Sequence, residues 1–157
     1  MPYCPPCEFR ATLSQAGGKL DRAKRILAID DERINLRVIG GLLRNLGYEP
    51  VLTETWAEAQ TLLDISIDLV LLDVMMPEMD GFTVASKIRE MPGVSDVPII
   101  MVTALTSKQD RLRAVEAGAN DFISKPIDLT ELRVRMGSLL KMKESQDEVK
   151  RYQAELE

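Results

Sequence analysis

The feature that most constrains the fold of this chain is a regular alternation of short apolar runs with amphipathic helical patterns between residues 25 and 140. A continuous apolar run fits a strand that is buried on both faces, as in a parallel sheet covered by helices on either side. Right-handed crossovers place the intervening helices on those faces. The sequence therefore predicts a doubly wound α/β domain. The five expected strands are RILAID (25–30), a run near 49–52, a run at 69–72, PIIMVT (98–103) and DFIS (121–124).

Capping residues and helical spacing predict where the helices begin, end and face the sheet. Thr55 and Glu58 have the spacing of a capping box, as do Asp128 and Glu131. A glycine directly after an apolar stripe commonly ends a helix. Helices are expected to begin near Thr55, Asp80, Ser107 and Asp128, and to end at Gly47 and Gly118. The residues expected to face the sheet are Leu36, Ile39, Leu43, Leu46, Trp56, Ala59, Leu62, Leu63, Phe82, Ala85 and Ile88.

Composition favours one globular domain that works in the cytoplasm. The 157 residues are 45% apolar, which is enough for a single sizeable core. The net charge is −5 and the twenty basic residues are scattered, so we expect neither direct nucleic-acid binding nor binding to anionic lipid. No apolar run approaches membrane-spanning length, and no signal-peptide pattern opens the chain.

The domain organisation predicted from the sequence has three parts. Residues 1–22 lack periodicity and are expected to form a disordered leader or a vector-derived remnant. Residues 23–140 form the globular domain, and 141–157 extend its last helix. Cys4 and Cys7 lie in the leader, and no further Cys or His exists to complete a zinc site within the chain. A thioredoxin-type centre would need this pair where a strand meets a helix, so the role of the two cysteines stays open.

Polar residues follow the predicted strands at the positions where ligands bind in open parallel sheets. Asp30 and Asp31 follow the first strand, Asp73 the third, Thr103 the fourth and Lys125 the fifth. Three carboxylates at one rim repel one another unless a cation joins them, and oxygen ligands suit Mg2+. We expect Asp31 and Asp73 to bind Mg2+ directly and Asp30 to act through a water molecule.

These strand-end residues, together with MMPEMDG (75–81) and the pair Lys125-Pro126, resemble the receiver domain of two-component response regulators, the chemotaxis-type module. The match spans residues 23–140. The resemblance implies a flavodoxin-like, five-stranded parallel sheet with strand order 2-1-3-4-5 and an extended C-terminal helix. It implies that Asp73 is the phosphoacceptor, that the backbone carbonyl of Met75 is a further Mg2+ ligand, and that the Lys125-Pro126 peptide bond is cis.

The same resemblance assigns the residues that would bind and sense the phosphoryl group. Lys125 would pair with one phosphoryl oxygen, and the Thr103 hydroxyl and the Ala104 backbone N–H would bind another. Thr103 and Phe122 would form the switch, which would act on the surface of the fourth helix, fifth strand and fifth helix. Alone, Thr103 could cap a strand, Lys125 could be a surface lysine, and Phe122 could be a simple core residue.

Two apolar residues beside the acceptor predict a long-lived phosphoryl group. Met75 lies two residues after Asp73, and Leu105 lies two residues after Thr103. Many receivers have more polar residues at both places. Because apolar side chains there hinder an attacking water molecule, we expect slower hydrolysis than in receivers with polar residues at these positions.

The last helix is expected to run to the end of the chain and to form a homodimer. Its apolar seam has heptad spacing but covers only two heptads, so a helix that frays into solvent is the alternative. The extension resembles the signalling linkers that join receivers to diguanylate cyclases or cyclic-dinucleotide phosphodiesterases, and Leu156 and Glu157 could be a vector scar. The seam residues are Met142, Ser145, Val149, Tyr152 and Leu156.

Two other functions are alternatives to a phosphoacceptor domain. A haloacid-dehalogenase-type phosphatase needs an acid two residues after its nucleophile, and Met75 stands there instead. A phosphorylation-independent dimerisation scaffold stays open. Because the chain has no histidine, a separate sensor histidine kinase or phosphotransfer protein must supply the phosphoryl group. The chain is thus expected to be no enzyme beyond its own phosphorylation and dephosphorylation, and its kinase and output cannot be read from the sequence.

Overall fold

The computed structural model describes residues 23–104 and 107–156, with the side chains of 154–156 left out. The predictions for the leader with Cys4 and Cys7, for Leu105 and for the side chain of Leu156 therefore lie outside the described residues. The strands and helices are β1 Arg25–Ile29, α2 Arg33–Asn45, β2 Glu49–Thr53, α3 Trp56–Leu62, β3 Leu69–Asp73, α4 Gly81–Glu90, β4 Ile99–Thr103, α5 Lys108–Ala117, β5 Asp121–Ser124 and α6 Leu129–Leu156.

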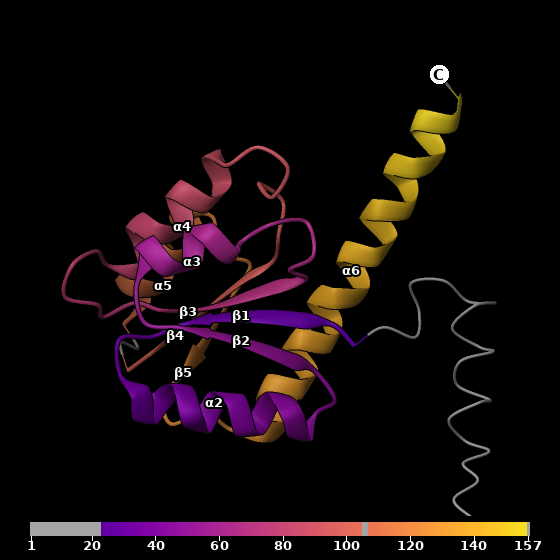
Figure 1. Ribbon diagram of the computed structural model, residues 1–157. Helices are drawn as coiled ribbons and strands as arrows, with labels where there is room; N and C mark the ends of the chain where they lie inside the picture. Colours follow the sequence, from indigo (N-terminus) through magenta and orange to yellow (C-terminus); the bar gives the residue numbers. More distant parts are fainter. Residues whose placement is uncertain (1–22, 105–106, 157) are drawn as a thin grey trace, which may run out of the picture.

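The five strands form one parallel sheet in the order β2-β1-β3-β4-β5, which confirms the predicted fold. Helices α2 and α6 cover one face of the sheet, and α3, α4 and α5 cover the other (Figure 1). Helix α6 continues well beyond the sheet toward the C-terminus (Figure 1). In the described parts of the chain, no helix is both long and apolar enough to cross a membrane.

The core consists of two apolar clusters, one on each face of the sheet. In β1, Ile26 and Ala28 point into the cluster under α2 and α6, whereas Leu27 and Ile29 point into the cluster under the other three helices. The central strands β3 and β4 are buried along their whole length. Burial on both faces explains why the strand sequences are continuously apolar instead of alternating. This rigid centre holds the carboxyl ends of the strands in place.

The predicted helix ends are confirmed in detail. The side chains of Thr55, Asp80, Ser107 and Asp128 each accept a hydrogen bond from the backbone N–H three residues later. Gly47 and Gly118 have positive φ angles of 89° and 106° at the ends of α2 and α5, a backbone conformation that glycine adopts without steric cost.

One prediction about the inner face of α3 was wrong. Leu62 was expected to face the sheet, but it is 40% exposed. Helix α3 ends at Leu62, and the chain leaves the helical path there, since Leu63 has extended backbone angles. Leu63 is buried in the core, so only one of the two leucines that helical spacing placed on the inner face is in fact there.

Candidate functional site

Three aspartates meet at the carboxyl end of the sheet. Asp30 directly follows β1, and Asp73 is the last residue of β3, the strand paired with β1. Oxygen atoms from the carboxylates of Asp30, Asp31 and Asp73 all lie within 4.8 Å of one another. Asp30 and Asp73 are only 1% and 4% exposed, and Asp31 is the most exposed of the three. The residues that sequence reasoning assigned to Mg2+ are therefore close enough to share one ion.

Lys125 approaches this cluster from the loop after β5. Its Nζ lies 3.2 Å from Asp73 Oδ1 and 3.4 Å from Asp30 Oδ2. The peptide bond between Lys125 and Pro126 is cis, as the resemblance implied. Sequence reasoning expected the lysine beside Asp73 but missed its contact with Asp30, which lies 95 residues away along the chain. No local pattern in the sequence marks such a contact.

The electrostatics of the cluster favour a divalent cation. Burial and the neighbouring charge of Asp30 raise the pKa of Asp73 to about 6, although Lys125 acts in the opposite direction. Burial disfavours a charged Lys125, but the carboxylates of Asp73 and Asp30 outweigh this effect and raise the pKa of the ammonium group. When all three carboxylates are ionised, one lysine leaves two negative charges without compensation. A divalent cation supplies that charge.

The donor set also fits Mg2+ in particular. Mg2+ prefers oxygen ligands, keeps several water molecules and is commonly held by one or two carboxylates with a phosphate oxygen. The cluster offers carboxylate oxygens alone, with neither nitrogen nor sulfur among the three residues. The backbone N–H of Met75 points back to Asp73 Oδ1 at 3.4 Å. The role of the Met75 carbonyl as a further ligand stays a prediction.

The loop after β3 places α4 tightly against the backbone of the acceptor strand. The N–H of Gly81 donates to the carbonyl of Val74 over 2.9 Å. A Cβ atom at Gly81 would lie 2.5 Å from the carbonyl oxygen of Asp73 and 2.8 Å from Cα of Val74. Only glycine fits this approach without a shift of the backbone. The sequence reading took this glycine as part of a helix start and missed its packing role.

Thr103 is the last residue of the neighbouring strand β4, and Ala104 directly follows it. Asp73 pairs with Val102 in the β3-β4 register, so Thr103 is the next residue along β4. Thr103 is fully buried, whereas Ala104 is exposed. The backbone carbonyl of Thr103 accepts a hydrogen bond of 2.8 Å from the N–H of Lys125. The structure thus brings all the predicted phosphoryl-binding residues to one edge of the sheet.

Phe122, the predicted switch aromatic, lies on β5 at the edge of the sheet. It is partly buried and packs against the core cluster under α3, α4 and α5. The guanidinium group of Arg111 on α5 lies 5.8 Å from the centre of its ring. The ring therefore contacts both the core and the exposed helix α5, as either a switch or a simple core role requires.

Comparison with known proteins identifies the family. Residues 26–136 match the response regulator receiver domain, and the chain belongs to that family. It is 39% identical to the response regulator PleD of Caulobacter vibrioides over 134 residues, which are 83% of this chain and 29% of PleD. It is 35% identical to RpaA of Synechocystis sp., a DNA-binding dual master transcriptional regulator, over 74% of this chain and 49% of RpaA.

Solved structures agree with this assignment. The receiver domain protein of Methanospirillum hungatei, described as CheY-like, has 27% identity and a TM-score of 0.71, with 80% of this chain and 99% of that chain covered. The chain therefore covers nearly all of this solved receiver domain protein, but less than a third of PleD and about half of RpaA. It is a receiver domain of two-component signalling.

Proposed function

We propose that this receiver accepts a phosphoryl group on Asp73 in an Mg2+-dependent reaction and relays it as a signal. The observation that carries the proposal is the convergence of three carboxylates from β1 and β3 with the ammonium group of Lys125. In phosphoryl transfer, catalysis rests mainly on positioning and on neutralising charge, and a carboxylate can be the nucleophile. This site supplies both a positioned nucleophile and fixed positive charge.

Transfer to Asp73 exchanges one bond at phosphorus for another. A carboxylate oxygen of Asp73 attacks the phosphorus of a phosphohistidine on a sensor histidine kinase or phosphotransfer protein. The new P–O bond forms as the P–N bond breaks, and the leaving imidazole nitrogen keeps the electron pair. Bound Mg2+, held by Asp31 and Asp73 and through water by Asp30, would neutralise charge on the transferring group. Lys125 pairs with a second phosphoryl oxygen, and the Thr103 hydroxyl and Ala104 N–H bind a third.

The signal is then read from surfaces next to the site. Movement of Thr103 toward the phosphoryl group vacates space that Phe122 can fill, which alters the surface formed by α5, β5 and α6. Helix α6 is the route to a homodimer and to an effector that carries the output. The receiver, residues 23–140, acts in the cytoplasm, does not bind nucleic acid itself and catalyses only its own phosphorylation and dephosphorylation.

Phosphorylation by a small-molecule donor tests this function without a cognate kinase. The protein is incubated with acetyl phosphate and Mg2+, and its intact mass is measured against the Asp73→Asn variant. A gain of one phosphoryl group in the wild type alone is expected. No gain in either protein would favour the dimerisation scaffold. Trp56, the only tryptophan of the chain, lines a hollow together with Asp31, so its fluorescence gives an independent titration of Mg2+ binding.

A further inference from the structure

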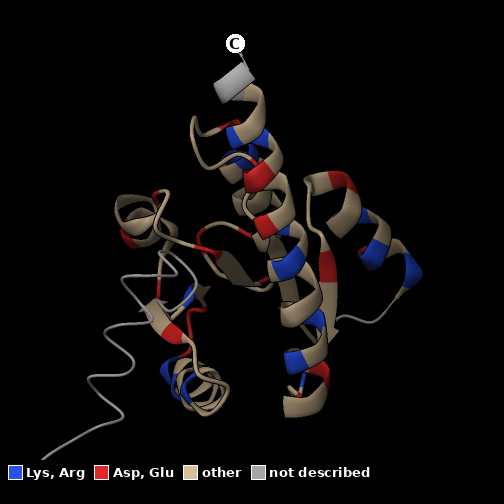
Figure 2. Cartoon of the chain, turned by 90° about the vertical axis from the view of Figure 1, so that its right-hand side faces the viewer, with Lys and Arg blue, Asp and Glu red and all other residues tan. Residues whose placement is uncertain are grey.

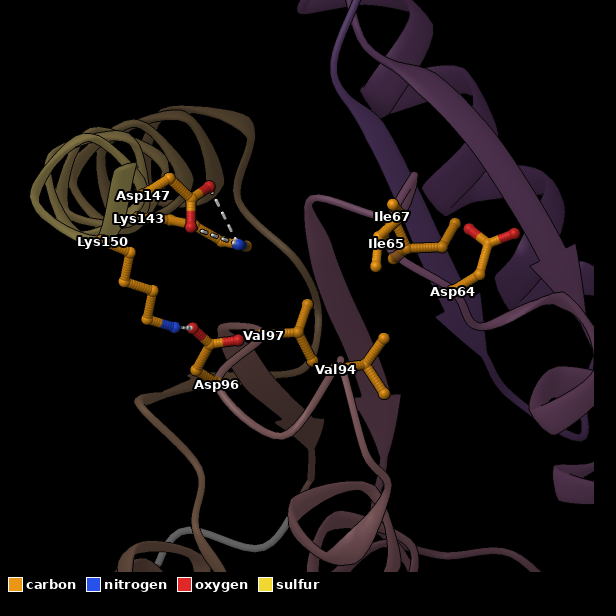
Figure 3. A pocket seen from close by; sticks show the side chains of 10 residues that line it. Asp64, Ile65, Ile67, Val94, Asp96, Val97, Lys143, Asp147 and Lys150 are labelled. Atoms are coloured by element: carbon orange, nitrogen blue, oxygen red, sulfur yellow. Dashed lines mark hydrogen bonds and ion pairs between the residues drawn. The ribbon is translucent and has the colours of Figure 1, made fainter. Parts of the chain in front are cut away.

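The C-terminal half of α6 leaves the core but stays in contact with the receiver. Leu139 and Leu140 are the last residues of α6 in the core cluster. Beyond them the helix passes the amino-terminal edge of the sheet, opposite to the edge that carries the acceptor. Lys24, just before β1, pairs with Glu144 at 2.7 Å. Six residues further along the helix, Lys150 pairs with Asp96 in the loop between α4 and β4 (Figure 3).

We call these two ion pairs the clasp. The pair of Lys150 and Asp96 closes over a hollow. Figure 3 shows Lys143, Asp147 and Lys150 of α6 on one side of it, facing the loop that carries Asp96. The apolar side chains of Val94 and Val97 line the floor of the same hollow. Within the helix, Lys143 Nζ forms an ion pair with Asp147 Oδ2 at 3.2 Å. The residues that α6 contributes to this hollow are all charged.

The receiver side of the clasp is held rigidly. Arg89 of α4 donates hydrogen bonds of 2.9 Å to the backbone carbonyl of Ser95 and 2.5 Å to that of Val97, the two neighbours of Asp96. The same guanidinium group donates to the carbonyl of Gly118 in the α5-β5 connection. The hydrogen bond from Lys150 lowers the pKa of Asp96, which keeps this carboxylate ionised. Asp96 is therefore a fixed anionic anchor.

The apolar seam of α6 lies on the other side of the helix. Lys143, Asp147 and Lys150 are spaced i, i+4 and i+7, and so form one ridge. Met142 and Val149 are each 54% exposed and Tyr152 is 66% exposed. At 3.6 residues per turn, the seam lies about 140° around the helix from the ridge of Lys143, Asp147 and Lys150. Basic and acidic residues both lie along α6 (Figure 2).

We infer that the clasp is an electrostatic strap that fixes the direction in which the α6 extension leaves the receiver and turns its apolar seam outward. The inference rests on the relay through α6 proposed above, because the strap sets the path that this helix takes away from the receiver. Each ion pair is partly exposed to solvent, so each stabilises the contact between α6 and the receiver only slightly. The strap therefore holds the helix in place but can open without unfolding of the receiver.

Hydrogen exchange of the full chain tests the strap. Lys150→Glu removes one ion pair and places a like charge beside Asp96, so amides of 143–153 are expected to exchange about fivefold faster than in the wild type. Exchange in the strands should not change. In the wild type, raising the salt concentration from about 0.05 M to about 0.5 M should speed exchange of the same segment, because salt screens partly exposed charges.

Lys141→Glu is the matched control. Lys141 is an exposed lysine of the same helix for which the described residues offer no ion pair, so the variant makes the same charge change away from the clasp. The double variant Asp96→Lys with Lys150→Asp reverses the pair and should restore slow exchange. Equal effects of Lys150→Glu and Lys141→Glu, or no rescue by the reversed pair, would overturn the inference. Phosphorylation by acetyl phosphate should stay normal in Lys150→Glu, so a loss of phosphorylation in the wild type would refute the proposed function and leave the strap unaffected.

Discussion

Replacing Asp73 with asparagine should stabilise the metal-free protein at neutral pH. Asp73 has its pKa raised from 3.8 to about 6, first by burial and then by the charge of Asp30. A carboxyl group with a raised pKa in the folded state favours folding only while it is protonated. Its stabilising contribution is complete below about pH 3.8 and is lost as the pH rises through about 6. Asparagine keeps an oxygen that can accept from Lys125 and carries no such charge.

The size of the effect follows from the same shift. A shift of about two pKa units changes the free energy of unfolding by about 3 kcal/mol between low pH and high pH. About 1.4 kcal/mol of this change falls between about pH 5 and pH 7.5. The advantage of the Asp73→Asn variant over the wild type in the free energy of unfolding should therefore grow by about that amount over this range. Urea titrations with EDTA at both pH values measure it.

Controls separate this effect from general charge removal. Glu116→Gln changes an exposed carboxylate on α5 and should show no comparable pH-dependent gain. Added Mg2+ should stabilise the wild type and narrow the gap, but leave the Asp73→Asn variant unchanged. A variant that is no more stable than the wild type at pH 7.5, or a gain that does not depend on pH, would show that the three carboxylates do not strain the metal-free fold.

Three further predictions concern the residues around the acceptor. Lys125→Met should shift the midpoint of pH-dependent Mg2+ binding, followed by tryptophan fluorescence, to higher pH, since Lys125 lowers the pKa of Asp73; an unchanged midpoint would contradict the pairing. Gly81→Ala should destabilise the protein by about 1–3 kcal/mol and slow phosphorylation, because its Cβ would clash with the acceptor backbone. Gly137→Ala, in open space on α6, should instead stabilise by about 0.5–1 kcal/mol, and equal effects in urea titrations would refute this reasoning. Met75→Asn should shorten the lifetime of the phosphoryl group, measured by the decay of intact mass, and a longer lifetime would argue against water exclusion by the methionine.

The strands and the helix caps could be predicted because local patterns determine them, whereas the order of the strands in the sheet was implied only by the resemblance to receiver domains. The caps at Thr55 and Ser107 depend on a hydrogen bond that spans three residues, and continuous apolar runs mark buried strands. The convergence of the strand-end residues followed from a general rule about parallel sheets. These parts of the account needed no knowledge of long-range side-chain contacts.

The contacts that sequence reasoning missed join residues far apart in the chain. Lys125 binds Asp30 across 95 residues, and Lys150 binds Asp96 across 54. Arg89 reaches carbonyl groups in two different loops. Such contacts depend on how side chains are directed in the folded protein, and periodicity does not encode this. The exposure of Leu62 was misjudged for a related reason, because helical spacing does not show where a short helix stops.

The claim that Asp73 is the phosphoacceptor can be tested at the level of the single residue. The protein is treated with acetyl phosphate and Mg2+, and sodium borohydride then reduces any acyl phosphate to the corresponding alcohol, which converts an aspartyl phosphate to homoserine. Peptide mapping by mass spectrometry locates the modified residue. The account predicts homoserine at position 73, dependent on Mg2+ and absent without acetyl phosphate. Homoserine at Asp30, Asp31 or another carboxylate, or at no position, would contradict it.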